Sequence, residues 1–240
     1  MPRAGKPARR VAAVERAIAV LDELAREARE FGTNELARRI DVNPSTASRL
    51  LATLESARLV ERVPPGGRYR LGLRLLELGN AALARLDVRA VARPQLERLV
   101  EETGETATLS IPGERDVVTV DFVQSASSVQ SVARLGRPSV AHATAAGKVF
   151  LAFAGVPLPA GALERFTPRT ITDPRRLAAE VERVRARGWA EAAGERERDL
   201  NALAAPIFGA DGRLAAILGL QGPKGRFDRD ARRAAVDPIL

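Results

Sequence analysis

A run of short polar side chains around a single arginine offers the chemistry of nucleic-acid recognition. Asn43 followed by Pro44 is a start signal for a helix, since Asn caps a helix N-terminus and Pro fits its first position. From Pro44 to Leu54 apolar residues recur at helical spacing, so the opposite face carries the short side chains. An arginine can donate two hydrogen bonds to guanine, and hydroxyls can bond bases or phosphates. The pattern predicts a helix that reads the major groove of double-stranded DNA with Asn43, Ser45, Thr46, Ser48, Arg49 and Thr53.

Other reactive residues offer little chemistry. The chain has no cysteine and a single histidine, His142, which excludes disulfides, thiolate metal sites and catalytic pairs built on a second histidine. The pair 147–148 (Gly-Lys) is similar to the end of a phosphate-binding loop, but the upstream glycine spacing is missing. Asp116 and Asp121, or the charged run 195–199, could pair carboxylates for hydrolysis. A solvated loop explains them better, and we expect no catalytic residue, no metal and no cofactor.

Two shorter helices are predicted to hold the reading helix. A first helix over 11–29 follows from apolar residues at helical spacing, namely Val14, Ile18, Leu21, Leu24 and Ala28. After Gly32, Thr33 can cap a second, short helix in which Leu36 and Ile40 share one face. We expect the N-terminus of this helix, with Thr33, to lie at the DNA surface.

A basic hairpin is predicted after the reading helix. The Pro-Pro-Gly-Gly turn at 64–67 separates two short runs of strand-forming residues. Three helices and such a hairpin make a winged helix-turn-helix. The arginines of the wing are suited to the phosphate backbone or the minor groove, and they are Arg62, Arg68 and Arg70.

The charge of the chain agrees with a polyanionic partner. The net charge is +8, of which +6 falls in residues 1–90, and residues 36–75 hold eight arginines against three acids. No apolar run approaches the ~18 residues that would span a bilayer. The basic start leads into an amphipathic segment rather than a signal peptide. We therefore expect a cytoplasmic protein with no membrane contact.

The remainder of the chain predicts a linker and an α+β domain. From Leu73 to about Arg89 the apolar residues form a stripe that few polar residues interrupt. This indicates a helix whose apolar face packs against another copy of the chain, so we expect a homodimer or homotetramer. Beyond it, helices alternate with strands in hairpin order, which favours an antiparallel sheet with helices on its faces. The expected helices are 94–103, 145–153 and one from Asp173–Pro174 to Gly188, and the expected strands are 106–111, 117–123, 131–135, 200–208 and 214–221.

Several segments together resemble the isocitrate-lyase-regulator (IclR) family. They are VERAIAVLDELARE, NELARRIDVNPSTASRLLATLESARLVERV, RYRLGLRLLELG, LGRPSVAHATAAGKVFLAF and LAAPIFGADGRLAAILGLQGP, and with others they cover nearly the whole chain. The resemblance implies a winged helix-turn-helix over 1–71, a linker or dimerisation helix over 72–90, and a GAF-like effector domain over 91–240. It also implies that this last domain binds a small organic metabolite.

The resemblance implies a set of pocket residues as well. By motif position they are Ser131, Ala145, Ala146, Ala192, Leu200, Ala202, Gly219 and Gln221. Where members that bind small acids commonly show an acidic residue, Cys or Ser, and a Ser pair, this chain has Ala192, Ala202, and Gly219 with Gln221. A buried carboxylate needs donors or a cation. We therefore expect a larger, more apolar effector, such as an aromatic one, with Gln221 as its main polar contact.

The predicted function is that of an effector-responsive transcription regulator, a repressor or an activator, of a catabolic operon. One alternative is a ligand-independent regulator whose effector domain has degenerated. A second is an enzyme built on 92–240, and a third is an architectural DNA binder that ignores sequence. The enzyme requires convergent catalytic groups, which the sequence does not offer. The architectural binder leaves the C-terminal domain unexplained.

Overall fold

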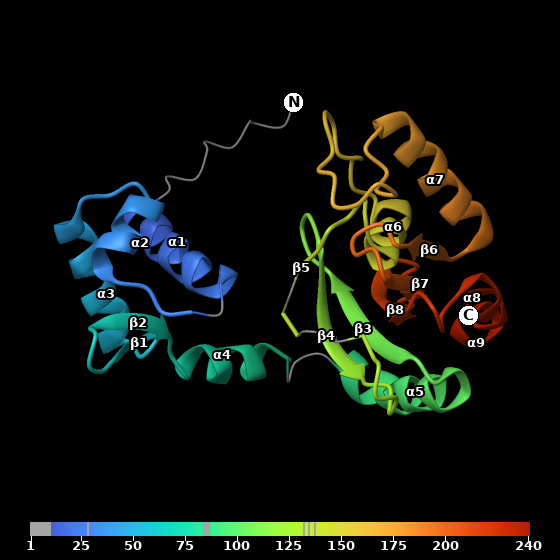
Figure 1. The fold of residues 1–240 in the computed structure, drawn as a ribbon, viewed down its shortest axis with the longest axis horizontal. Helices are drawn as coiled ribbons and strands as arrows, with labels where there is room; N and C mark the ends of the chain where they lie inside the picture. The colour runs from blue at the N-terminus through green and yellow to red at the C-terminus, as the bar shows by residue number, and fades with distance from the viewer. Residues whose placement is uncertain (1–10, 28, 84–86, 132, 134, 137) are drawn as a thin grey trace. The chain divides into compact units, whose positions relative to one another are not determined.

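The chain folds into two compact units, Met1–Arg85 and Leu86–Leu240 (Figure 1). The computed structural model describes residues 11–240 except residues 28, 84–86, 132, 134 and 137. We describe each unit by itself.

The first unit is a helix-turn-helix followed by a β-hairpin. Its elements are α1 (Ala12–Arg26), α2 (Thr33–Arg39), α3 (Pro44–Ser56), β1 (Val60–Val63), β2 (Arg68–Leu71) and α4 (Arg74–Leu83). The hairpin is antiparallel, with Arg62 opposite Tyr69. The hydrophobic core cluster draws on every element before α4 and on the connection after α1, and its buried residues are Val20, Leu24, Phe31, Leu36, Leu51, Leu54, Val60 and Tyr69. The predicted winged helix-turn-helix is confirmed.

Of the two helix caps predicted in this unit, the structure has one and lacks the other. The side chain of Asn43 caps α3 as predicted, and it accepts a hydrogen bond from the Thr46 amide. Thr33 does not cap α2, so that prediction was wrong. Gly32 holds the N-cap position without a side-chain bond, and Thr33 is the first helical residue. Glycine is one of the residues that are preferred at an N-cap.

Part of the apolar stripe of α1 faces outward. Val14 and Ile18 are 54% and 51% exposed, whereas Val20 and Leu24, further along the helix, are buried. The apolar side chains of α1 are therefore buried in the core only in the second half of the helix. The helix also ends at Arg26, and Ala28 lies outside the described residues.

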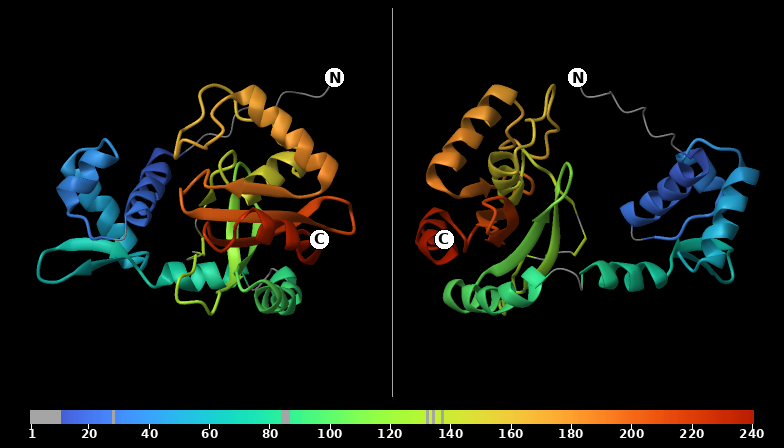
Figure 2. Two further views of the ribbon diagram at one scale, coloured as in Figure 1. Left: turned by 45° about the vertical axis from the view of Figure 1, so that its right-hand side comes forward. Right: turned by 180° about the vertical axis from the view of Figure 1, so that it is seen from behind.

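The second unit is an antiparallel sheet with helices on both faces (Figure 2). Its strands, in the order β5-β4-β3-β8-β7-β6, are β3 (Thr106–Pro112), β4 (Val117–Val123), β5 (Pro138–Ser139), β6 (Ala190–Ala193), β7 (Leu200–Phe208) and β8 (Leu214–Pro223). Its helices are α5 (Asp87–Thr103), α6 (Ala145–Phe153), α7 (Pro174–Arg187), α8 (Arg229–Ala234) and α9 (Val236–Ile239). The predicted α+β class is confirmed.

Neighbouring residues of β6 show which helices cover which face of the sheet. Ala192 packs in the core formed with α6 and α7. The side chain of Glu191 instead pairs with Arg232 of α8. Because successive strand residues point to opposite faces, α6 and α7 cover one face and α8 the other. The face under α6 and α7 is the one that bears the site described below.

Three expected elements differ from the structure. The helix expected over 73–89 ends as α4 at Leu83, and α5 begins at Asp87 rather than at Pro94, which lies inside it. A proline inside a helix removes one backbone hydrogen-bond donor, but α5 continues as a helix past Pro94. A strand was expected at 131–135, but its described residues are not in a strand, and β5 pairs with β4 instead.

Candidate nucleic-acid interface and ligand cavity

The polar face of α3 is displayed to solvent. Ser45, Ser48, Arg49 and Thr53 are exposed and Thr46 is half-buried, while Ala47, Leu51 and Leu54 on the other side are buried. The Asn43 carboxamide oxygen accepts both the Thr46 amide and the Ser45 hydroxyl at 2.8 Å. Asn43 therefore caps the start of α3. Its exposed face has the short side chains that a helix needs to approach a groove closely.

The wing presents three exposed arginines that already have intramolecular contacts. Arg68 donates to the carbonyl of Glu30 at 2.9 Å, and Arg70 pairs with Glu61 directly across the hairpin. The guanidinium of Arg62 lies against Gly67, where an added Cβ would be 2.9 Å from Nη2. A guanidinium carries five donors, so each can bond phosphate while keeping these contacts. The contacts hold the wing in place.

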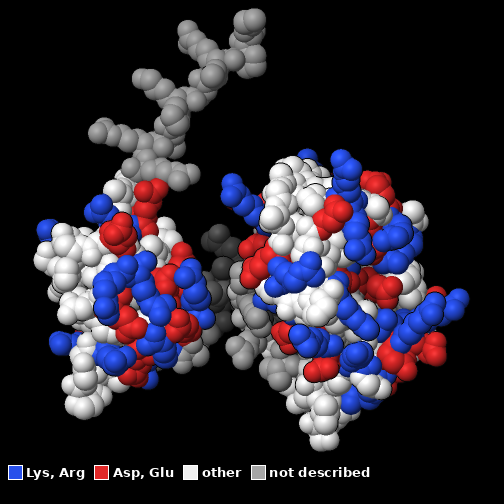
Figure 3. Space-filling view, turned by 45° about the horizontal axis from the view of Figure 1, so that its top comes forward, with Lys and Arg blue, Asp and Glu red and all other residues white. Residues whose placement is uncertain are grey.

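An ionic cluster joins α1, α2 and the connection between them. The guanidinium carbons of Arg29 and Arg39 lie 4.2 and 4.7 Å from the centre of the buried Phe31 ring. Arg29 hydrogen-bonds Glu27 and Glu35, and these bonds lower the pKa of both carboxyls. Figure 3 shows positive and negative side chains intermingled on the visible face of each unit. The charge on the faces seen in this view is therefore mixed rather than uniformly positive.

A cavity of about 620 Å³ opens on the α6 face of the second unit's sheet. The sheet, the start of α6 and the segments around 130 and 197 contribute its walls. All eight residues that the family resemblance implied lie at its wall, namely Ser131, Ala145, Ala146, Ala192, Leu200, Ala202, Gly219 and Gln221. The fold thus brings together residues as far apart as 131 and 221, and their role in binding remains a prediction.

Hydroxyl groups that the sequence analysis missed also line this cavity. They are Thr108, Ser110, Thr119, Ser139 and Thr144. Thr108 of β3 lies directly opposite Gly219 of β8, and a Cβ at 219 would be 2.5 Å from its hydroxyl oxygen. The hydroxyl therefore occupies the space that a side chain at 219 would need. The alternation Thr106, Thr108, Ser110 along one strand was the available signal.

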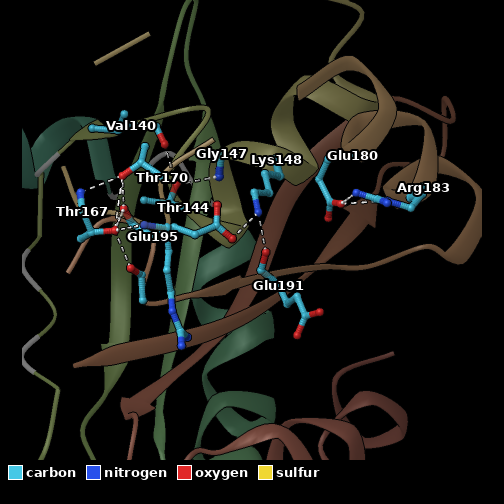
Figure 4. A network of polar contacts seen from close by, with 12 residues as sticks. Val140, Thr144, Gly147, Lys148, Thr167, Thr170, Glu180, Arg183, Glu191 and Glu195 are labelled. Atoms are coloured by element: carbon cyan, nitrogen blue, oxygen red, sulfur yellow. Dashed lines mark hydrogen bonds and ion pairs between the residues drawn. The ribbon is translucent and has the colours of Figure 1, made fainter. Parts of the chain in front are cut away.

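The loop 195–199, expected to be merely solvated, forms a charged wall of the cavity. Behind it Lys148, which is 1% exposed, donates to Glu195 Oε1 at 2.7 Å and to the Glu191 carbonyl at 2.8 Å (Figure 4). The carbonyl of Glu195 in turn accepts the hydroxyls of Thr167 and Thr170. Lys148 is therefore part of a buried ion pair between α6 and this loop.

The other candidates have structural roles. A Cβ at Gly147 would be 2.5 Å from the backbone of Ala141, so this glycine lets the start of α6 approach the preceding loop. The ring of His142 bonds the Glu164 carbonyl at 2.9 Å. Asp121 pairs with Arg93 of α5 at 3.2 Å. Among the described residues there is no group of three or more acidic or histidine side chains placed to hold a metal.

None of the helices in the described residues is both long and apolar enough to cross a membrane.

Two family models match the chain. The model described as "IclR helix-turn-helix domain" matches residues 13–64, and the one described as "Bacterial transcriptional regulator IclR C-terminal" matches residues 80–240. Together they extend over both units.

Individual proteins are similar over nearly the full length. The chain is 34% identical to the HTH-type transcriptional regulator BhcR of Paracoccus denitrificans, over 96% of this chain and 84% of that protein. The crystal structure of an IclR transcriptional regulator from Alicyclobacillus acidocaldarius has a TM-score of 0.81 at 27% identity, covering 96% and 95%. An IclR homologue from Microbacterium hydrocarbonoxydans, crystallised with 4-hydroxybenzoate, has a TM-score of 0.74 at 27% identity, covering 95% and 98%. The chain belongs to the IclR family of DNA-binding transcription regulators.

Proposed function

We propose that the protein is an effector-responsive regulator that binds an operator through α3 and the wing and a small organic molecule in the cavity of its second unit. The observation that supports this most is the convergence of the eight predicted pocket residues on one cavity of about 620 Å³. That volume falls within the range of about 300–1,000 Å³ that is usual for small-molecule sites. We further propose that it acts by binding alone, without a catalytic step or cofactor, in the cytoplasm.

For the DNA half we assign base reading to α3. Arg49 would bond guanine, and the hydroxyls of Ser45, Thr46, Ser48 and Thr53 would bond bases or phosphates. We assign the contacts with DNA phosphates, which would position the protein on the duplex, to the start of α2 and to the wing. The residues are Thr33, Arg62, Arg68 and Arg70.

For the ligand half we propose an organic acid that carries further polar groups. Ala145 and Ala146, the first two residues of α6, line the cavity, and early helix amides lack intrahelical partners. A carboxylate would be bound there, while the apolar surface of Ala192 and Ala202 would contact the rest of the molecule. The relative crystallised with 4-hydroxybenzoate supports an aromatic acid as the effector. The hydroxyls of the cavity revise the expectation that Gln221 would be its main polar contact.

We propose that the protein is a homodimer or homotetramer, with residues 72–90 as the linker. Leu73, Leu76 and Leu78 are 73%, 62% and 49% exposed, and Val11 of the first unit is 61% exposed. So much exposed apolar surface on one small unit favours burial against a second copy. Two copies would place two reading helices in successive major grooves of a palindromic operator.

A thermal-shift screen followed by DNA binding tests this function. Aromatic and aliphatic acids are screened for a raised melting temperature, since a ligand that binds only the folded state stabilises it by RT ln(1 + L/Kd), where L is the concentration of free ligand. Each hit is then added to binding assays on a duplex selected from a random pool. Ala202→Phe fills the cavity and should abolish the shift and the DNA response, whereas Ala215→Phe, at an exposed position of β8, should leave both intact. A regulator with a degenerate effector domain would bind the duplex with no hit in the screen.

Substitutions in α3 and the wing separate specific from general DNA binding. Arg49→Ala should weaken binding to the selected duplex by about 1–3 kcal/mol and relax its base preference. Arg62→Ala should weaken binding to all sequences similarly and reduce the salt dependence. If Arg49→Ala leaves the selected sequences unchanged, α3 does not read the groove as assigned.

A further inference from the structure

The hydroxyl in the middle of strand β3 differs from its two neighbours on that strand. Thr106, Thr108 and Ser110 alternate along β3, and the outer two are bonded. Thr106 donates to the Ser131 carbonyl at 3.1 Å, and the Ser110 hydroxyl lies 3.3 Å from that of Thr119. The hydroxyl of Thr108 makes no hydrogen bond within the part of the chain that the structure describes. A hydroxyl partly withdrawn from water without a partner is unfavourable, so this one calls for an explanation.

The neighbouring glycine shows that this hydroxyl faces the cavity. In β8, Ile217 packs in the core with α6, and Gly219, two residues further along the strand, points to the same face. A Cβ at Gly219 would lie 2.5 Å from the hydroxyl oxygen of Thr108. The oxygen is therefore on the cavity side of the sheet, above a residue that has no side chain of its own. Thr108 lines the cavity and is only half-buried, so a ligand can reach it.

The hydroxyl groups that the sheet contributes to the cavity lie at one side of it. The strand order is β5-β4-β3-β8-β7-β6, and Thr119 and Thr108 come from β4 and β3. Ala202 and Ala192, from β7 and β6 at the other side, present only methyl groups. An effector whose apolar part contacts these alanines would therefore place a second polar group over β3.

The chemistry of a hydroxyl indicates which kind of group would fit there. A hydroxyl is neutral, so it cannot balance a second carboxylate taken out of water. It can both donate and accept, so it can pair with a hydroxyl or with a carbonyl oxygen. A methyl group in the same place would leave the hydroxyl of Thr108 without a partner, which costs binding free energy. The site therefore favours a neutral oxygen group.

We propose that Thr108 is a specificity-determining residue of the cavity and that its hydroxyl forms a hydrogen bond with a neutral oxygen group of the effector, a hydroxyl or a keto group. The effector class is then an organic acid that carries such a group, rather than an acid whose remaining part is purely apolar. This inference rests on the proposed binding of an organic acid in the cavity.

The test uses pairs of acids that have the same shape and differ in one oxygen group. They are 4-hydroxybenzoate with 4-methylbenzoate, 3-hydroxybenzoate with 3-methylbenzoate, and 4-acetylbenzoate with 4-isopropenylbenzoate. Calorimetry on the full chain should show roughly 5- to 100-fold tighter binding of the oxygenated member of at least one pair. Thr108→Val keeps the shape of the side chain without its hydroxyl and should remove this preference. Thr172→Val, the same change at a half-buried threonine outside the cavity, should retain it.

The stability of the ligand-free chain separates a binding role from a structural one. Because the Thr108 hydroxyl has no partner among the described residues, Thr108→Val should leave the melting temperature unchanged or raise it. Thr119→Val instead breaks the bond to the buried Ser110 and should lower it. Without an acid, Thr108→Val should also bind the selected duplex as the parent does.

Three results would overturn the inference alone. They are equal binding within every pair by the parent chain, an undiminished preference in Thr108→Val, and a lowered melting temperature of Thr108→Val, since the hydroxyl would then be bonded within the protein. Binding of none of the acids by the parent chain overturns the proposed function, and this inference with it.

Discussion

Placing a side chain at Gly219 tests whether the cavity floor is built as the structure indicates. An added Cβ at this position would lie 2.5 Å from the hydroxyl oxygen of Thr108, the cross-strand neighbour on β3. This is about 0.9 Å closer than the lower limit of an ordinary contact near 3.4 Å. Overpacking of a buried site costs about 1–3 kcal/mol. We therefore expect Gly219→Ala to lower the free energy of unfolding of the second unit by that amount.

Removing the hydroxyl should reverse the sign of this effect. With Thr108→Ala in place, the atoms nearest to the new Cβ would be the Leu203 carbonyl oxygen at 3.6 Å and the Cβ of residue 108 at 3.9 Å. Alanine also restricts the unfolded chain more than glycine does, which stabilises by about 0.4–1 kcal/mol. Gly219→Ala should thus be neutral or stabilising in the Thr108→Ala background. The coupling between the two positions should be at least about 1 kcal/mol.

Urea unfolding followed by tryptophan fluorescence measures this double-mutant cycle. The chain has one tryptophan, Trp189, which lies in the second unit, so the signal reports that unit. Gly225→Ala is the control, because nothing lies within 4 Å of a Cβ added there. Additive effects of the two substitutions, or a tolerated Gly219→Ala in the parent chain, would refute the assignment of the Thr108 hydroxyl to this space.

Three other substitutions probe the buried ion pair, the start of the reading helix and the ionic cluster. Lys148→Met leaves the Glu195 carboxylate buried without its cation, and we expect a loss of about 3–5 kcal/mol in urea unfolding that the further substitution Glu195→Leu largely recovers. Asn43→Ala removes the cap of α3 and should destabilise the first unit by about 1 kcal/mol, seen as an earlier loss of helical circular dichroism; an unchanged transition would contradict the capping role. Arg29→Ala tests pH dependence. Because the Arg29 bonds lower the pKa of Glu27 and Glu35, they contribute stability above the ordinary pKa of a glutamate, and this is lost as the pH falls through the lowered values. The stability difference between parent and Arg29→Ala should therefore shrink as the pH falls, and a constant difference would argue against the cluster.

Features that depend on neighbouring residues in the sequence could be predicted. Asn43 and Asp173 each precede a proline and each caps its helix, and Gly188 ends α7 in a left-handed conformation. These arrangements follow from local backbone chemistry, so the sequence contains what is needed to predict them. The failed cap at Thr33 shows the limit, because glycine can also occupy an N-cap and the sequence does not say which residue does.

Features that depend on pairing between distant segments could not be predicted. Thr108 reaches the cavity because β3 lies beside β8, and it occupies the space above Gly219 only in that register. Lys148 meets Glu195, 47 residues away, through the packing of α6 on the sheet. A charged run such as 195–199 looks like a solvated loop until its partner is known. The family resemblance supplied the positions at the cavity wall, but not these partners.

The most direct test of the central claim measures whether the DNA site and the cavity are coupled. The affinity of the full chain for its selected duplex is measured with and without a saturating acid from the screen, and the affinity for the acid is measured with and without the duplex. An effector-responsive regulator should show the same factor in both directions, on the order of 5- to 150-fold, because the coupling free energy is reciprocal. Ala202→Phe should bind the duplex with no response to the acid. An acid that binds the cavity yet leaves the duplex affinity unchanged would contradict the account.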